Sequence, residues 1–205
     1  MEKVTSIQMR SQSGVTLVEV LVTMVILAIG LLGLVALQAR VQILQAEAYQ
    51  RAQALMLLKD MAGRIANNRN NAAGYLTVAA VPPAVEGDPP GEVMEPLGAG
   101  MVCPAPGATR QSSDRAEWCL ALQGAGETLG ASNVGAMVDG RGCVERLPTG
   151  EYLITVAWQG LAPIAAPPEG VDCGLGLYDG DGDSPCTDDL CRRVVTTVVI
   201  IPSLT

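Results

Sequence analysis

The chain has 205 residues, no histidine and no phenylalanine, and its formal net charge is −8 at pH 7. This length accommodates one ordinary soluble domain in addition to a membrane segment. Without histidine, the Ser-His-Asp and Cys-His arrangements of nucleophilic enzymes are excluded. The acidic balance argues against a nucleic-acid partner, because binding to phosphates needs a basic patch. We therefore expect neither an enzyme nor a nucleic-acid-binding protein.

Residues 1–14 form a polar leader that carries Lys3 and Arg10 ahead of an apolar run. Positive charge before a membrane segment places that end in the cytoplasm and the rest of the chain outside. We expect this leader to be absent from the mature protein, whose net charge would then be −9 because the leader carries a net +1.

Residues 13–37 are apolar apart from a few small polar residues and one acid, Glu19, and no charged side chain occurs from Val20 to Leu37. A helix of about 18 or more apolar residues crosses a bilayer core of roughly 30 Å. The run is too long for the apolar region of a secretory signal peptide, which is about 7–15 residues. A plain membrane anchor explains the length but not Glu19, because an ionised carboxylate in lipid costs about 2.5–3.5 kcal/mol on insertion scales.

A third interpretation accounts for both the acid and the length. The segment Gly14-Val15-Thr16-Leu17-Val18-Glu19, followed by apolar sequence, resembles the class III signal of type IV prepilins. The resemblance implies that a prepilin peptidase cuts between Gly14 and Val15 and then methylates the new amine of Val15. The family usually has phenylalanine at the first mature position, where this chain has Val15.

The resemblance makes Glu19 the fifth residue of the mature chain, about one helical turn beyond the new amine. Opposite charges attract strongly where the dielectric constant is low. Glu19 would pair with its own amine or with the amine of the next subunit, and the second pairing would set the register of a filament. The alternative is that Glu19 is solvated at the membrane interface.

Helical periodicity continues beyond the apolar run. Apolar residues recur every three or four positions, which indicates one helical face: Val41, Leu44, Ala48, Ala52, Leu55, Leu58, Ala62 and Ile65. No proline interrupts Val15 to Ala66, so we predict one continuous helix with a transmembrane half, 15–37, and an amphipathic half, 38–70. The asparagine-rich segment 67–71 is its expected end. Gly30 and Gly33 either allow local unwinding or let helices approach closely.

The remainder, 71–205, is predicted to be a globular domain outside the cytoplasm. Turn signals indicate a long loop over 72–117, and 116–122 is compatible with a short helix or strand. Residues 151–159 and 192–201 have clear strand character, with Tyr152, Ile154, Val156 and Trp158 on one face. Weaker strands are predicted at 134–138 and 144–147. The expected fold is α+β, a pilin fold in which the long N-terminal helix packs on a small antiparallel sheet.

The six cysteines are best interpreted as disulfides made outside the cytoplasm: Cys103, Cys119, Cys143, Cys173, Cys186 and Cys191. A zinc site would need four thiolates, because histidine is absent. Six cysteines allow about 15 pairings. Cys186 with Cys191 is a plausible local loop, followed by Cys103 with Cys119, and the sequence does not choose among the pairings.

Carboxylates occur at alternate positions in an acidic loop, at Asp179, Asp181 and Asp183. This spacing is that of the first half of a calcium loop, although Ser184 and Leu190 stand where an EF-hand has glycine and glutamate. A calcium site and a solvated acidic turn both remain open. No other cofactor is expected.

Over its whole length the chain resembles minor pilins of the PilV (type IV pilus modification protein) family, most specifically over 13–66, 151–160 and 192–204. The resemblance implies a subunit held in the inner membrane with its C-terminal domain in the periplasm, and later built into pili at the cell surface. Its partners would be the major pilin, other minor pilins, the prepilin peptidase and the inner-membrane assembly platform, in support of twitching motility and adhesion. A type II secretion pseudopilin is the alternative, and a DNA-uptake pilin is disfavoured because no basic stripe is present.

Overall fold

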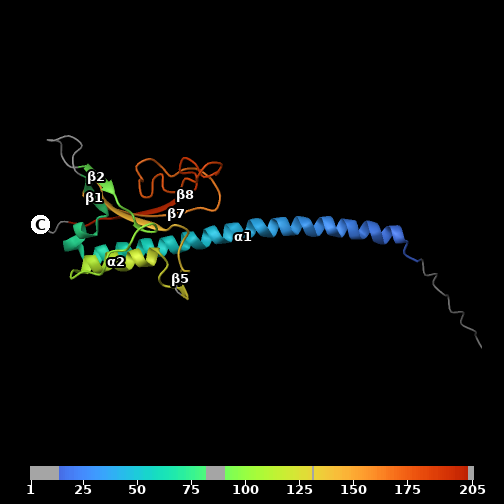
Figure 1. Cartoon of the computed structure of the whole chain (residues 1–205), viewed down its shortest axis with the longest axis horizontal. Coiled ribbons are helices and arrows are strands. Elements are labelled where there is room, and N and C mark those ends of the chain that lie inside the picture. Colours follow the sequence, from blue (N-terminus) through green and yellow to red (C-terminus); the bar gives the residue numbers. More distant parts are fainter. Residues whose placement is uncertain (1–13, 82–90, 131, 203–205) are drawn as a thin grey trace, which may run out of the picture. The chain divides into compact units, whose positions relative to one another are not determined.

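The computed structural model describes residues 14–81, 91–130 and 132–202, so the leader residues 1–13 lie outside the described part. The chain divides into two compact units, Met1–Leu44 and Gln45–Thr205. In chain order the elements are α1 (Leu17–Asn67), the 3₁₀ helix η1 (Arg69–Tyr75), β1 (Val78–Val81), β2 (Gly91–Met94), β3 (Leu97–Gly98), α2 (Arg110–Leu122), β4 (Thr128–Leu129), β5 (Ser132–Asn133), β6 (Arg141–Arg146), β7 (Tyr152–Gln159) and β8 (Arg192–Val199) (Figure 1).

Helix α1 begins at a side-chain cap. The Thr16 Oγ1 atom accepts a hydrogen bond of 3.3 Å from the Glu19 N–H, which satisfies one of the amides that every helix start leaves unpaired. From Leu17 to Leu37 the large apolar side chains are exposed on all sides of the helix. Among the described residues, α1 is the helix whose length and composition suffice to cross a membrane. An all-round apolar helix needs lipid or other helices around it.

The second half of α1 packs on a sheet through Gln50, Ala54, Leu58, Met61 and Ile65, which recur every three or four residues. The long helix packed on a small antiparallel sheet is the predicted α+β layout, and the helix ends at Asn67, as its asparagine-rich end indicated. The predicted stripe was rotated, however. Leu55 is 39% exposed and Ala54 is buried in its place. The buried face of α1 is turned toward α2, because α2 packs on one flank of α1.

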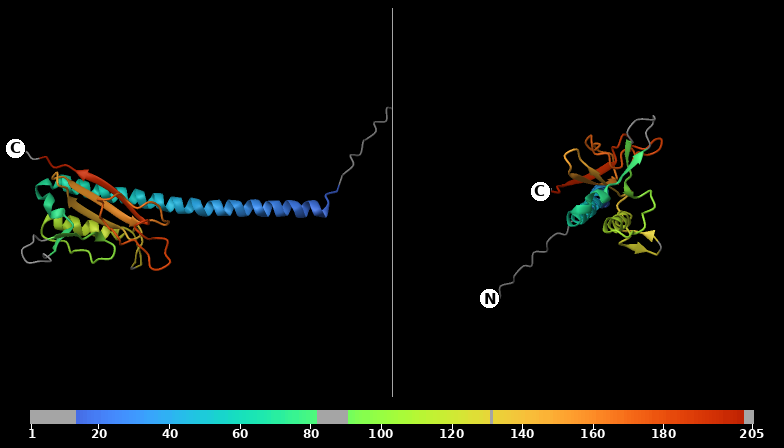
Figure 2. Two further views of the ribbon diagram at one scale, coloured as in Figure 1. Left: turned by 90° about the horizontal axis from the view of Figure 1, so that it is seen from above. Right: turned by 90° about the vertical axis from the view of Figure 1, so that its left-hand side faces the viewer.

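The main sheet has four antiparallel strands in the order β3-β6-β7-β8 (Figure 2). Ile154, Val156 and Trp158 of β7 join the core formed with α1 and α2, as the strand alternation predicted. Between them, Ala157 faces the opposite side and contacts a second cluster that includes Cys173. Both faces of the sheet are therefore covered, one by helices and the other by the loop between β7 and β8.

Two parts of the predicted globular domain differ from expectation. The segment 72–117, predicted as a loop, contains β1, β2, β3 and the first turns of α2, which starts at Arg110 rather than near 116. Thr109 caps α2 by accepting a hydrogen bond from the Ser112 N–H. Residues 134–138, predicted as a strand, form a connection in which the Val138 carbonyl accepts a bond of 2.9 Å from the Gln159 N–H. The weak strand predicted at 144–147 exists as β6.

Candidate functional site

The predicted processing point lies in the short segment before α1. Gly14 and Val15 are both exposed and precede the first helical residue. A Cβ atom added at Gly14 would meet no atom within 4 Å, and the backbone there is not in the left-handed region that favours glycine. The fold of the described chain therefore places no demand for glycine at this position.

Glu19 lies in the first turn of α1, where the partial positive charge of the helix N-terminus favours a carboxylate. Its backbone N–H is bonded to Thr16. Its side chain is exposed, and within the described part of the chain no hydrogen bond or ion pair involves its carboxylate. The carboxylate is thus available to a cation that the described residues do not supply.

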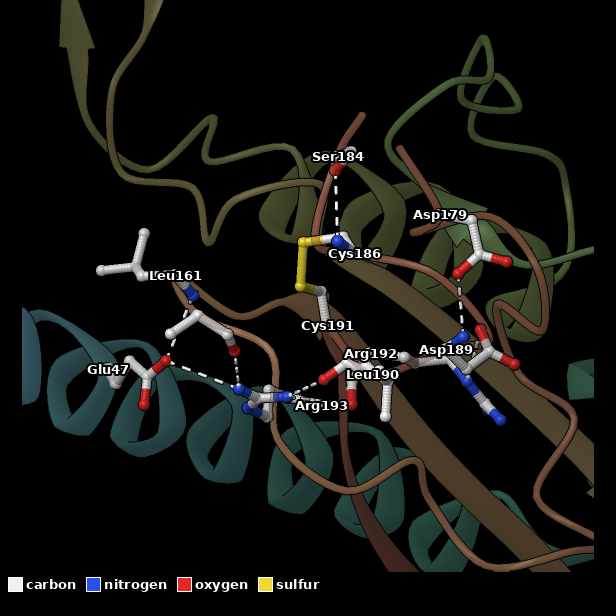
Figure 3. The surroundings of a disulfide bond; sticks show 11 residues. Glu47, Leu161, Asp179, Ser184, Cys186, Asp189, Leu190, Cys191, Arg192 and Arg193 are labelled. Carbon is white, nitrogen blue, oxygen red and sulfur yellow. Dashed lines mark hydrogen bonds and ion pairs between the residues drawn. A yellow bond between two sulfur atoms is a disulfide. The ribbon is translucent and has the colours of Figure 1, made fainter. Parts of the chain in front are cut away.

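The loop of residues 160–191 connects β7 to β8 and is fastened at several points (Figure 3). Disulfides join Cys143 of β6 to Cys173 and Cys186 to Cys191. Near its start, the Leu161 N–H donates a bond of 3.1 Å to Glu47 Oε1 of α1. Helix, sheet and loop are therefore held together by covalent and polar contacts within the second unit.

The acidic residues of this loop have different environments. The Asp179 carboxylate accepts a bond of 2.8 Å from the Asp189 N–H, and the Asp189 carboxylate accepts one of 3.0 Å from the Gly176 N–H. Asp181 and Asp183 are exposed. No group of three or more carboxylates and cysteines suited to a metal ion is found among the described residues. The structure thus uses Asp179 and Asp189 to shape the loop and does not bring Asp179, Asp181 and Asp183 together.

The third disulfide, Cys103–Cys119, ties the segment before α2 to that helix. The two local pairs that the sequence suggested, Cys186 with Cys191 and Cys103 with Cys119, are both present, and the remaining pair is Cys143 with Cys173. The described residues include no free cysteine.

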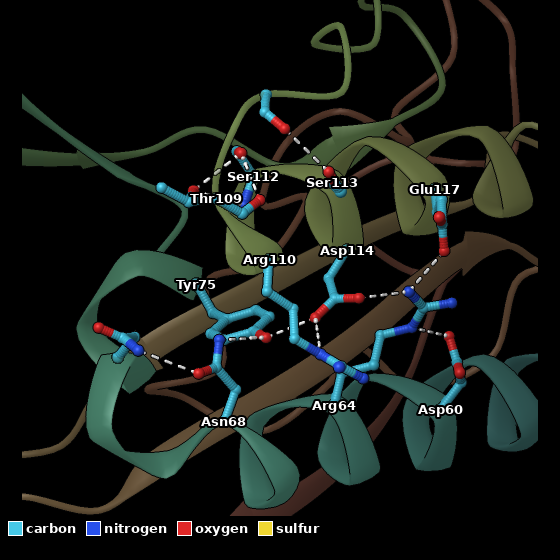
Figure 4. A network of polar contacts seen from close by, with 12 residues as sticks. Asp60, Arg64, Asn68, Tyr75, Thr109, Arg110, Ser112, Ser113, Asp114 and Glu117 are labelled. Atoms are coloured by element: carbon cyan, nitrogen blue, oxygen red, sulfur yellow. Dashed lines mark hydrogen bonds and ion pairs between the residues drawn. The ribbon is translucent and has the colours of Figure 1, made fainter.

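A polar network that the sequence did not reveal joins α1 to α2 and η1 (Figure 4). Arg64 Nη1 lies 2.8 Å from both Asp114 Oδ1 and Glu117 Oε2, and Arg64 Nε lies 2.9 Å from Asp60 Oδ2. Burial alone would lower the pKa of Arg64, but its bonds to Glu117, Asp60 and Asp114 raise that pKa. Arg64 is thus held charged between three carboxylates.

Tyr75 completes this network. Its hydroxyl donates a bond of 2.5 Å to Asp114 Oδ2 and accepts one of 3.1 Å from Asn68 Nδ2. Burial, followed by the bond to Asp114, raises the pKa of Tyr75, so the phenol stays protonated and remains a donor. The residues of this network do not form an arrangement typical of a catalytic site. Their contacts join α1, α2 and η1.

Comparison with known proteins bears on the N-terminal segment. Residues 9–35 match the family model of the prokaryotic N-terminal methylation motif. No match was found among curated proteins or among solved structures. The N-terminus therefore carries the N-methylation motif of a class III prepilin signal. Together with the long helix and small sheet, this motif indicates a structural protein like the type IV pilins and pseudopilins, a class that is generally not enzymatic, and it indicates membrane anchoring.

Proposed function

We propose that the protein is a minor type IV pilin of the PilV type. It would enter pili in small amounts, prime their assembly or cap their tip, and thereby support twitching motility and adhesion. The observation that carries the proposal is the match of residues 9–35 to the methylation motif in a chain whose α1 continues from an exposed apolar half into a helix packed on a sheet.

Processing is the first step of this proposal. The prepilin peptidase cuts between Gly14 and Val15 on the cytoplasmic side and methylates the amine of Val15. The absence of any steric or backbone need for glycine in the chain's own fold supports recognition of Gly14 by an external enzyme. The exposure of the segment before α1 gives such an enzyme access to the bond.

The location follows from the same elements. Residues 15–37 span the inner membrane, 38–67 continue α1, and 71–205 form the domain in the periplasm and later on the pilus. Disulfides at the three cysteine pairs suit an oxidising compartment. The partners are the major pilin, other minor pilins, the peptidase and the inner-membrane assembly platform.

Mass spectrometry of the mature protein tests the class. We expect an N-terminus at methylated Val15, and an intact leader would overturn the proposal. Deletion of the gene then separates a pilin from a type II secretion pseudopilin. Loss of twitching with normal protein secretion supports the pilin, whereas loss of secretion with normal twitching supports the pseudopilin.

A further inference from the structure

Strand β8 forms an open edge of the main sheet. Its residues pair with β7 from Arg192↔Gln159 to Val199↔Tyr152. On its other side, none of the described residues forms a backbone hydrogen bond with Val194 to Ile201. In an antiparallel strand, alternate N–H and C=O groups point away from the neighbour, so this edge presents unpaired main-chain groups.

The edge also lacks the usual protection. Exposed edges are generally guarded by charged side chains, proline or bulges. From Val194 to Ile201 the sequence is VVTTVVII, which contains none of these residues, and its pairing with β7 is regular. Arg192 and Arg193, at the start of the strand, are engaged with the loop and with Glu47. The edge is therefore suited to pairing with another strand.

The flank of α1 beside this edge is open as well. Helix α2 lies along the other flank, where the Leu57 carbonyl accepts a bond of 3.0 Å from Trp118 Nε1. Because α2 packs next to β3 and β6, β8 is the sheet edge remote from it (Figure 2, right). Glu47, whose Oε1 lies 3.6 Å from Arg193 Nη2 of β8, marks this side of α1. Arg51, Leu55 and Lys59 follow Glu47 at four-residue intervals in the same ridge, and all three are exposed.

The ridge makes the open flank of α1 positively charged. In the described part of the chain, neither Arg51 nor Lys59 forms an ion pair or a side-chain hydrogen bond. Leu55 between them offers an apolar contact. A strand placed next to β8 would therefore find unpaired N–H and C=O groups along β8. Its side chains on the helix side would face the ridge, with a cation at each end and Leu55 between them. A second copy of β8 does not fit, because residues 192–201 carry two arginines and no carboxylate.

We propose that β8 is a docking edge for an extended, β-branched and acidic segment of another protein, which adds to the sheet as a fifth strand. Main-chain hydrogen bonds to β8 bind the segment, as in other cases of β-strand addition. Its apolar side chains contact Leu55, and its carboxylates face Arg51 and Lys59. The inference concerns the second unit alone and stands whether or not the chain is a pilin.

The test uses the purified full chain in detergent micelles and three fluorescent peptides. The first, VTETVTETV, places two glutamates and the valine between them on one face of the strand, the second, VTKTVTKTV, reverses its charge, and the third, VTEPVPETV, cannot form a continuous strand. We expect the acidic peptide to bind at least about tenfold more tightly than the lysine peptide at low salt, which corresponds to about 1.4 kcal/mol. Hydrogen exchange of β8 amides should slow when it binds, and the proline peptide should not bind.

The matched variant is the double substitution Arg51→Glu and Lys59→Glu, at exposed positions that the fold does not use. It should reverse the preference in favour of the lysine peptide. Arg146→Glu, at an exposed position on β6, should leave the preference unchanged. The proposal is overturned by absence of binding, by equal binding of all three peptides, by unchanged exchange in β8, or by a preference that the double substitution does not alter.

Discussion

The buried guanidinium of Arg192 lies against the carboxylate of Asp189, with 3.2 Å between Nε and Oδ1. The same guanidinium donates bonds of 2.6 and 3.1 Å from Nη1 to the carbonyls of Val171 and Cys173. Arg192 is 3% exposed. Asp189 adopts a left-handed φ of 59°, which few residues other than glycine favour. The first residue of β8 therefore holds the middle and the end of the loop that precedes it.

Replacing Arg192 with methionine should destabilise the second unit strongly. The change leaves Asp189 as a buried carboxylate without its cation, and breaking a buried pair in this way costs about 3–5 kcal/mol. Chemical unfolding followed by the fluorescence of Trp118 and Trp158 measures the free energy. Arg146→Met, at an exposed position, is the control and should stay within about 0.5 kcal/mol of the parent chain. An Arg192→Met protein as stable as that control would contradict the assigned role.

Tyr75→Phe should weaken the junction of α1, α2 and η1. The substitution keeps the buried ring and removes the donor to Asp114 and the acceptor for Asn68. A hydrogen bond to a charged group contributes about 1.5–3 kcal/mol, so we expect a loss in that range in the same unfolding measurement. Tyr49→Phe is the control because Tyr49 is 62% exposed. Equal stabilities of the two variants would show that the Asp114 bond contributes nothing.

The sequence predicted the elements whose pattern is local. The apolar run, the helical stripe and the alternation of β7 each depend on neighbours along the chain. The apolar run and the alternation of β7 led to the observed layout, and the stripe predicted the helix and the burial of Leu58 and Ile65 but not of Ala54. The start of α2 was missed because Ser112, Ser113 and Asp114 resemble loop sequence. Asp114 lies buried in a helix only because Arg64 and Tyr75, far away in the sequence, neutralise and bind its carboxylate.

Some features of the candidate site were likewise predicted from the sequence, and others were not. The N-terminal motif was predicted from a short contiguous segment, and residues 9–35 match a family model of it, whereas the roles of Gly14, Val15 and Glu19 stay predictions. The pairing of Cys143 with Cys173 was not predicted, because it joins β6 to a loop across a separation of 30 residues. The open edge of β8 was likewise not predicted from the sequence, because strand order depends on which strands pair and not on their composition.

Glu145→Gln should stabilise the protein at neutral pH. Burial, followed by the negative charge of Asp172, raises the pKa of Glu145. A raised carboxyl pKa means that the folded state binds the proton more tightly, so stability is greatest below the unfolded pKa of about 4.3 and declines as pH rises through the folded value. The amide removes this penalty. Because the site is part-exposed and screened, we expect a gain of about 0.3–1 kcal/mol at pH 7.

The gain from Glu145→Gln should vanish near pH 3, where the parent carboxyl is already protonated. Unfolding curves at pH 3, 5 and 7 measure the trend. Glu169→Gln, at an exposed position on the loop that carries Asp172, is the control and should show no such pH dependence. A constant difference across this range would rule out titration of Glu145 as its cause.

Glu19→Gln should leave the protein in the membrane and reduce its incorporation into pili. The amide preserves the size of the side chain and removes the charge that we propose pairs with the amine of Val15. Insertion should be unaffected, since the apolar run from Val20 to Leu37 is intact. Immunoblots of membrane and sheared-pilus fractions measure both quantities, with Glu169→Gln, at an exposed position, as a control that also removes a carboxylate. Normal amounts of the Glu19→Gln protein in sheared pili would reject the pairing.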